Sequence, residues 1–224
     1  MSETYRILLP LMLTVKVAFL ATVCAMSIGV TGAYLLSRKK FWGRDMTEVL
    51  FSLPLVLPPT VLGYYLLVMI GRNGCIGRFL NEHFGVSLIF TWQGAVLAAT
   101  IVSLPLVFKS AGAAFAAVNT QCEEAASTLG ASRVAVFLRV SLPLAWRGIL
   151  AGSMMAFARG MGEFGATLMV AGNLPGRTQT LSMAVYDAVQ AGDYPQANFL
   201  VLIITLVSMV ILYGSGKLLR ANWR

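Results

Sequence analysis

The sequence has little charge, a single histidine and no paired cysteines. Only 12% of its 224 residues are charged, about half the share usual in soluble proteins, and 58% are hydrophobic. A globule of this length cannot bury so much apolar surface, which excludes a soluble enzyme and a soluble nucleic-acid-binding protein. The three cysteines form no C-x-x-C pair and His83 is the only histidine, so we expect neither a metal site nor a disulfide framework.

Charged residues are absent from four long stretches, at 17–37, 49–71, 84–108 and 197–216. Each stretch is long enough to cross a hydrocarbon core of about 30 Å as an α-helix. A fifth apolar stretch, 142–174, is interrupted by Arg147, Arg159 and Glu163. The first stretch is too long for a cleaved signal peptide, so we expect a retained helix there.

These stretches predict an all-α integral membrane protein, with a single transmembrane domain over residues 1–224. The expected spans are 8–37, 48–71, 86–109, 144–173 and 197–218. Short helices are also expected in two outer loops, 73–87 and 180–190, where apolar residues recur at helical spacing. Such helices would lie on the membrane or the neighbouring spans, or dock an external partner.

Lysine and arginine are distributed unevenly between alternate loops. With the N-terminus outside, eleven fall on the inner side: Arg38, Lys39, Lys40, Arg44, Lys109, Arg133, Arg139, Arg147, Lys217, Arg220 and Arg224. Four fall on the outer side: Arg6, Arg72, Arg78 and Arg177. Inner loops carry the excess of basic residues in membrane proteins, so we expect the N-terminus outside and the C-terminus in the cytoplasm. Contact with membrane lipid then explains the net charge of +8 without a nucleic-acid partner.

The inner segment 121–143 predicts two short helices. Helix formers fill 123–129, with acidic residues at the start, where the helix dipole favours them. Gly130 can end this helix with a positive φ, and Ser132 is suited to cap a second one. Apolar side chains on such a knob need a groove to enter, which indicates a partner protein.

The spacing within this segment resembles the E-A-A-x3-G-x9-I-x-L-P loop of ABC importer permeases. Seven residues carry the resemblance: Glu124, Ala125, Ala126, Gly130, Val140, Leu142 and Pro143. Valine in place of isoleucine is the only departure, and the alternative is an ordinary amphipathic linker. The resemblance implies a type I ABC importer permease architecture. It also implies a cytoplasmic coupling loop that docks into an ATPase subunit through the turn around Glu124 and Gly130.

Two further stretches, 53–67 and 158–166, resemble the sulfate/molybdate branch of these permeases, and the double proline followed by Thr-Val-x-Gly resembles molybdate permeases more than sulfate permeases. This implies a permease in the bacterial inner membrane that translocates molybdate. The implied partners are two cytoplasmic ATPase subunits, a second permease copy in a homodimer, and an external or periplasmic molybdate-binding protein. No cofactor is expected on this chain. It lacks the G-x-x-x-x-G-K-[ST] pattern, so ATP and Mg²⁺ would be used by the ATPase subunit.

Pro58 and Pro59 lie near the middle of the second expected span. They remove two amide donors, so we expect the helix to break or kink there. If it restarts at Thr60, free N–H groups and the hydroxyl are placed to meet a passing oxyanion. The alternative is a simple packing kink.

Arg159 and Glu163 are four residues apart within the fourth expected span and can form an ion pair. Ionisable residues at membrane depth are costly. One interpretation is that the pair borders the translocation pathway or its gate, and the other is an internal salt bridge that fixes the helix. A stripe of small residues nearby is suited to helix packing within the subunit or across a dimer: Gly148, Gly152, Ala156 and Gly160.

Other functions remain open from the sequence. Within the same class, the cargo could be sulfate, thiosulfate or tungstate. A secondary transporter could also have five spans and buried charges, although no inverted repeat is visible. A membrane-embedded enzyme is the third alternative, and it lacks a cluster of acid–base or metal-binding residues.

Overall fold

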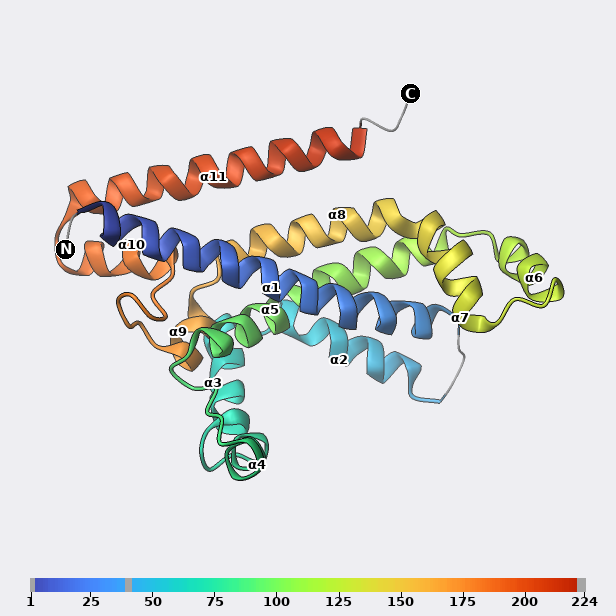
Figure 1. Ribbon diagram of the computed structural model, residues 1–224, viewed down its shortest axis with the longest axis horizontal. Coiled ribbons are helices and arrows are strands. Elements are labelled where there is room, and N and C mark those ends of the chain that lie inside the picture. Colours follow the sequence, from blue (N-terminus) through green and yellow to red (C-terminus); the bar gives the residue numbers. More distant parts are fainter. Residues whose placement is uncertain (1–2, 39–41, 221–224) are drawn as a thin grey trace.

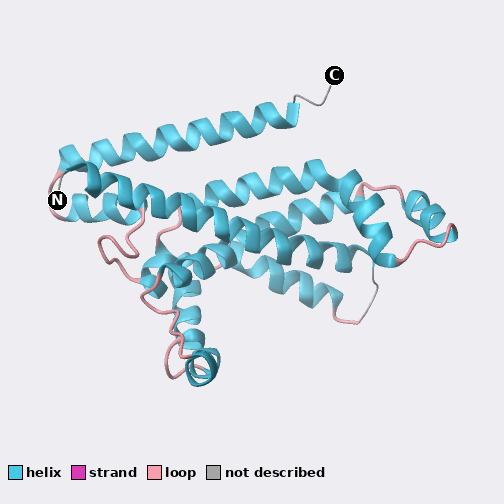
Figure 2. Cartoon of the chain, viewed as in Figure 1, coloured by secondary structure: helices cyan, strands magenta, loops and turns pink. Residues whose placement is uncertain are grey.

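In the computed structural model, residues 3–38 and 42–220 are described, and their regular secondary structure is helical, with loops and turns between the helices (Figures 1 and 2). The elements in chain order are α1 (Glu3–Arg38), α2 (Arg44–Val56), α3 (Pro59–Ile70), α4 (Cys75–Phe84), α5 (Trp92–Ala116), α6 (Thr120–Thr128), α7 (Arg133–Val136), the π-helical turn η1 (Phe137–Ser141), α8 (Leu142–Met161), α9 (Gly165–Ala171), α10 (Leu181–Gln190) and α11 (Tyr194–Arg220). The all-α prediction is confirmed. Three of the eleven basic residues expected on the inner side, Lys39, Lys40 and Arg224, lie outside the described residues.

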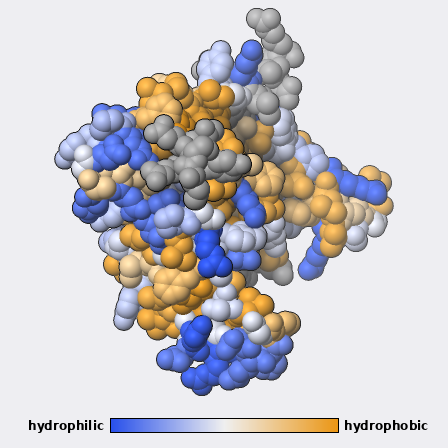
Figure 3. All heavy atoms as spheres, turned by 60° about the vertical axis from the view of Figure 1, so that its left-hand side comes forward, coloured by the Kyte–Doolittle hydropathy of each residue, from blue (hydrophilic) through white to orange (hydrophobic). Residues whose placement is uncertain are grey.

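Within the described residues, four helical segments are long and apolar enough to cross a membrane: Ile7–Arg38, Trp92–Ala116, Arg133–Met161 and Tyr194–Gly214. The broken pair α2 and α3 makes a fifth if it is counted as one span. Figure 3 shows hydrophobic residues over much of the surface, with hydrophilic residues in separate patches, one of them at its lower end, where the arm of α3 and α4 terminates. This distribution is expected of a chain whose sides face lipid.

The core of the bundle lies between α1, α5 and α8, which run side by side in Figure 1. Phe115 of α5 is fully buried there, with Tyr34 of α1 edge-on to it at 5.3 Å between ring centroids. The small residues of α8 face this core. A Cβ at Gly148 or Gly152 would lie 2.5 Å from the Cβ of Ala114 or Ser110 in α5. The stripe therefore packs within the subunit.

The second expected span, 48–71, is not one continuous helix. α2 ends at Val56 and α3 begins at Pro59, one residue before the expected restart at Thr60, and the two helix axes differ by 116°. Proline lacks the amide donor that would continue the first helix, and it suits the first turn of a new one. After this break α3 turns away from the bundle and leads to α4 (Figure 1).

The fourth expected span, 144–173, is wrong at both ends. Its helix stops at Met161, and after a short break the chain continues as α9. At the N-terminal end of α8, α7 and η1 run directly into the helix, so the second half of the predicted segment 121–143 is continuous with α8. The wide π-helical turn, with Leu142 N–H bonded to Phe137 O, precedes Pro143, whose ring would clash with the carbonyl four residues earlier in a regular α-helix.

The third expected span, 86–109, begins later and ends later, as α5. The Thr91 hydroxyl caps this helix by accepting the Gly94 N–H at 3.2 Å. The chain before it is fixed by a bond from Phe90 N–H to Val170 O of α9 at 3.1 Å. α5 continues through Pro105 without a break.

Both short helices expected in the outer loops are present as α4 and α10. α10 is packed into the bundle, because Leu181 and Met183 are fully buried and Leu181 N–H donates to Thr14 Oγ1 of α1 at 2.8 Å. α4 instead extends from α3 and leaves Phe79 and Phe84 more than half exposed.

α3 is held against α9 at Gly63. A Cβ at Gly63 would lie 2.7 Å from Met169 Cβ and 2.9 Å from Ala166 Cα. We expect Gly63→Ala to lower the melting temperature of the purified protein, because overpacking costs about 1–3 kcal/mol. Gly112→Ala in α5 is the matched control, since nothing lies within 4 Å of that position and alanine favours a helix over glycine. Equal melting temperatures for the two variants would contradict this packing.

Candidate functional site

Residues 119–141, which we call the knob, protrude at one end of the bundle (Figure 1). Asn119 caps α6 by accepting the Gln121 N–H at 2.9 Å. The helix ends at Thr128, and the turn that follows contains Gly130, which has φ +86° and donates to Ser127 O at 3.0 Å. Ala131 N–H closes the turn on Ala126 O at 3.1 Å, which is the helix-ending arrangement that favours glycine. The expected turn at Gly130 is present.

The knob exposes an apolar surface. Leu129, Val134 and Leu138 are 89%, 67% and 54% exposed, and Glu124 and Ala125 beside them are exposed as well. A cleft of about 970 Å³ separates the knob from the end of α1, and Glu124 is among its lining residues. Exposed apolar side chains that protrude from one end of the bundle are suited to contact with a partner protein.

The remaining residues of the predicted coupling loop lie inside the knob or at its base. Ala126, Val140 and Leu142 are half-buried, and Pro143 lies in the first turn of α8. These residues fix the shape of the knob, whereas Glu124 and Ala125 face outward.

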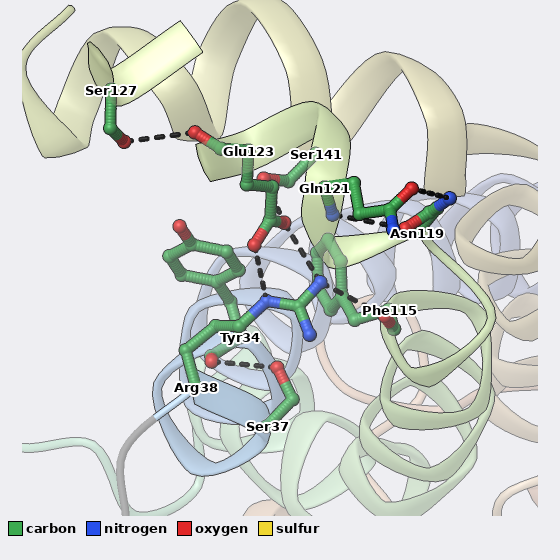
Figure 4. A network of polar contacts seen from close by, with 9 residues as sticks. All are labelled: Tyr34, Ser37, Arg38, Phe115, Asn119, Gln121, Glu123, Ser127 and Ser141. Carbon is green, nitrogen blue, oxygen red and sulfur yellow. Dashed lines mark hydrogen bonds and ion pairs between the residues drawn. The ribbon is translucent and has the colours of Figure 1, made fainter. Parts of the chain in front are cut away.

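Glu123 is a residue that the sequence reasoning missed. Its carboxylate forms two contacts with the Arg38 guanidinium, from Oε2 to Nε and from Oε1 to Nη2, each 2.8 Å (Figure 4). Arg38 Nη2 also donates to Phe115 O at 3.2 Å, and Ser141 Oγ donates to Glu123 Oε1 at 2.7 Å. The motif drew attention to Glu124, and no feature of the sequence separates the roles of the two neighbouring acids.

The break between α2 and α3 contacts the break between α8 and α9, at the first residues of α3 and α9. A Cβ at Gly165 would lie 3.1 Å from Pro59 Cβ and 3.3 Å from Thr60 N, so a larger residue would push the two helix starts apart. Pro58 and Thr60 are exposed beside the contact. The proline break therefore contacts Gly165, which follows Glu163 by two residues in the sequence.

Arg159 and Glu163 form the predicted ion pair, with Nη1 2.7 Å from Oε2. The Glu163 side chain is 2% exposed and that of Arg159 is 37% exposed. Glu163 lies beyond the end of α8, not on one continuous helix as expected, and its Oε1 accepts the Ala166 N–H at 2.9 Å. The carboxylate thus joins the last turn of α8 to the first turn of α9.

A second polar cluster, also missed from the sequence, orders the loop between α9 and α10. Asp187 accepts hydrogen bonds from Asn173 Nδ2 and Gln179 Nε2, each at 2.7 Å. Within residues 3–38 and 42–220, no three histidine, cysteine, aspartate or glutamate side chains lie close enough to hold a metal ion together.

Comparison with known proteins identifies the family of this chain. Residues 25–220 match the family model described as "Binding-protein-dependent transport system inner membrane component". The molybdenum transport system permease protein ModB of Escherichia coli K12 is 42% identical over 203 residues, which cover 90% of this chain and 89% of that protein. The sulfate transport system permease protein CysT of Salmonella typhimurium is 33% identical over 205 residues, 92% of this chain and 74% of that protein.

A solved structure shares the fold over the whole chain. The inward-facing MetNI methionine ABC transporter aligns with a TM-score of 0.74 at 18% sequence identity, and the alignment covers 100% of both chains. At this identity the likeness concerns the helical architecture alone.

Proposed function

The chain belongs to the family of binding-protein-dependent transport system inner membrane components, and from this premise we propose that it is the permease subunit through which an ABC importer carries molybdate. The observation that supports molybdate is the 42% identity to the molybdenum permease over nine tenths of both chains, against 33% to the sulfate permease. Sulfate, thiosulfate or tungstate is the second candidate, because the sulfate permease is a relative within the same family.

The chain itself is a membrane component and not an enzyme. ATP and Mg²⁺ would be bound by two cytoplasmic ATPase subunits, each receiving the knob of one permease copy. The exposed side chains of Leu129 and Val134 would supply the apolar contact, and Glu124 would pair with a basic residue of the ATPase. Closure of the ATPases on ATP would draw the two knobs together and open the spans outward, and hydrolysis would reset them.

The second permease copy would face α3. The side of α3 opposite to α9 leaves Tyr64, Tyr65 and Val68 more than half exposed, and a homodimer would cover it. With the N-terminus outside and the knob in the cytoplasm, the break at Pro58, Pro59 and Thr60 would border the passage between the two copies.

Arg159 and Glu163 would border the same passage or its gate. The positive charge of Arg159 is already paired at 2.7 Å, so an oxyanion would be attracted only weakly and released easily. A passage that holds its anion weakly cannot select it by affinity, so another protein must supply the selectivity. This supports an external molybdate-binding protein as the third partner.

The test is uptake of radioactive molybdate into proteoliposomes that contain the permease, its ATPase subunit and the external binding protein. We expect uptake that requires ATP and all three proteins. An excess of unlabelled molybdate should abolish it, and the same excess of sulfate should leave most of it. Stronger competition by sulfate or tungstate would reassign the cargo within the class, and uptake without the ATPase subunit would indicate a secondary transporter.

A further inference from the structure

We propose that Glu123, Arg38 and Ser141 form a joint that moves α1 and α8 together when the knob moves. The three are positioning residues for coupling, and the proposal rests on the proposed function of the chain as an ATP-driven permease. It assigns a role to an ion pair that lies behind the docking surface and does not touch the expected ATPase partner.

The joint gathers four elements around the Glu123–Arg38 ion pair (Figure 4). Glu123 belongs to α6, Arg38 ends α1, and Ser141 is the last residue of η1, directly before α8. Arg38 also donates to Phe115 O in the last turn of α5, where a cation is favoured by the helix dipole. A displacement of Glu123 is therefore passed to the inner ends of three spans at once.

Polar contacts, and not apolar packing, attach α6 to these spans. None of the residues of α6 is buried, so little hydrophobic contact secures the helix to the bundle. The Glu123 and Arg38 side chains, in contrast, are only 12% and 21% exposed, and Ser141 is fully buried. The carboxylate of Glu123 is thus the main tie between α6 and α1.

The geometry of the tie is stiff. Arg38 donates from Nη2 to Glu123 Oε1 at 2.8 Å, and its Nε lies 2.8 Å from Oε2 as an ion pair without a hydrogen bond, so both carboxylate oxygens are held close to the guanidinium. Ser141 adds a third direction through its hydroxyl at 2.7 Å. Because the groups are shielded from water, screening by salt is weak. A glutamine or a methionine at these positions keeps the size of the side chain but not the paired charges.

The test uses the complete complex in proteoliposomes, with ATP hydrolysis and molybdate uptake measured on the same sample. For Glu123→Gln and Arg38→Met we expect the ATPase subunits to co-purify and to hydrolyse ATP as in the unmodified complex. Uptake should fall by about tenfold, an effect of the size seen for coupling residues, so more ATP is spent per anion. The exchange Arg38→Glu with Glu123→Arg should restore part of the uptake.

Glu48→Gln is the matched control. Glu48 pairs with Lys109 at 3.2 Å between α2 and α5, with side chains 45% and 50% exposed, and neither residue touches the knob. This variant should keep normal uptake. If uptake and hydrolysis fall in the same proportion in the Glu123 and Arg38 variants, or if neither changes, the proposal is overturned.

A distance measurement tests the joint without reference to the cargo. Spin labels at Thr128 in α6 and Leu35 in α1, both exposed, would be introduced after replacement of the three native cysteines. In the unmodified complex the distance should stay constant on ATP binding, because the joint moves the two helices as a unit, and in Glu123→Gln it should change. A distance that changes equally in both would refute the joint. Failure of the proposed function would appear differently, as absent molybdate uptake by the unmodified complex.

Discussion

Replacement of Gly130 by valine is expected to abolish ATP-driven uptake while membrane insertion continues. The residue has φ +86° and follows the end of α6, where its own N–H and that of Ala131 each donate one backbone hydrogen bond to the helix. A β-branched residue in this conformation costs about 1–2 kcal/mol, which is enough to open the turn and to reorient the exposed residues on either side of it. We expect less ATPase subunit to co-purify with the variant, and uptake to fall by about tenfold or more.

Two variants separate the turn from general effects of the substitution. Gly176→Val places valine at φ +73° with nothing within 4 Å, in the loop between α9 and α10, and it should keep normal binding of the ATPase subunit. Gly130→Asn should retain most activity, because asparagine tolerates the left-handed region. Normal uptake by Gly130→Val would show that the knob does not couple the two subunits through this turn.

Loss of the Glu163 carboxylate is expected to destabilise the protein strongly. Glu163→Ala leaves the Arg159 charge without its partner at 2.7 Å and the Ala166 N–H without its acceptor. We expect a loss of roughly 2–3 kcal/mol, below the range for fully buried pairs because the Arg159 side chain is 37% exposed. The melting temperature of the purified permease should fall accordingly.

A double variant distinguishes the two roles proposed for this pair. Arg159→Met with Glu163→Gln removes both charges, and the glutamine oxygen can still accept the Ala166 N–H, so the melting temperature should return toward normal. If the pair borders the pathway, uptake should stay low in this stable variant. Full recovery of uptake together with stability would reduce the pair to a structural salt bridge between α8 and α9.

The knob and the ion pair lie at opposite ends of the same helix. α8 has 20 residues, about 30 Å in length, with Ser141 directly before it and the Arg159–Glu163 pair at its far end. Movement of the joint therefore has a direct route to the break before α9. The N-terminal end of α8 is held by the Ser141 hydroxyl and its C-terminal end by the Glu163 carboxylate, so both ends are held by specific contacts.

Local chemistry determined much of this protein from the sequence alone. The scarcity of charge predicted the helical membrane spans, because a charged side chain is costly in hydrocarbon. The missing amide donors of Pro58 and Pro59 predicted the break between α2 and α3, and the conformational freedom of Gly130 predicted the turn of the knob. The spacing of Arg159 and Glu163 predicted their ion pair. Each of these depends on residues within a few positions of one another.

The tertiary structure alone decided how these parts meet. Glu123 pairs with Arg38, which lies 85 positions earlier in the sequence, and no sequence pattern predicts a contact over that separation. The neighbouring Glu124 faces outward. The direction of α3, turned by 116° from α2, follows from its packing on α9 at Gly63 and Gly165 and not from the prolines, which dictate only that the helix must break. The end of α8 at Met161 could not be predicted from the sequence either, because apolar residues continue on both sides of it. The contact that stabilises this end, from Ala166 N–H to Glu163, forms only once the chain has turned.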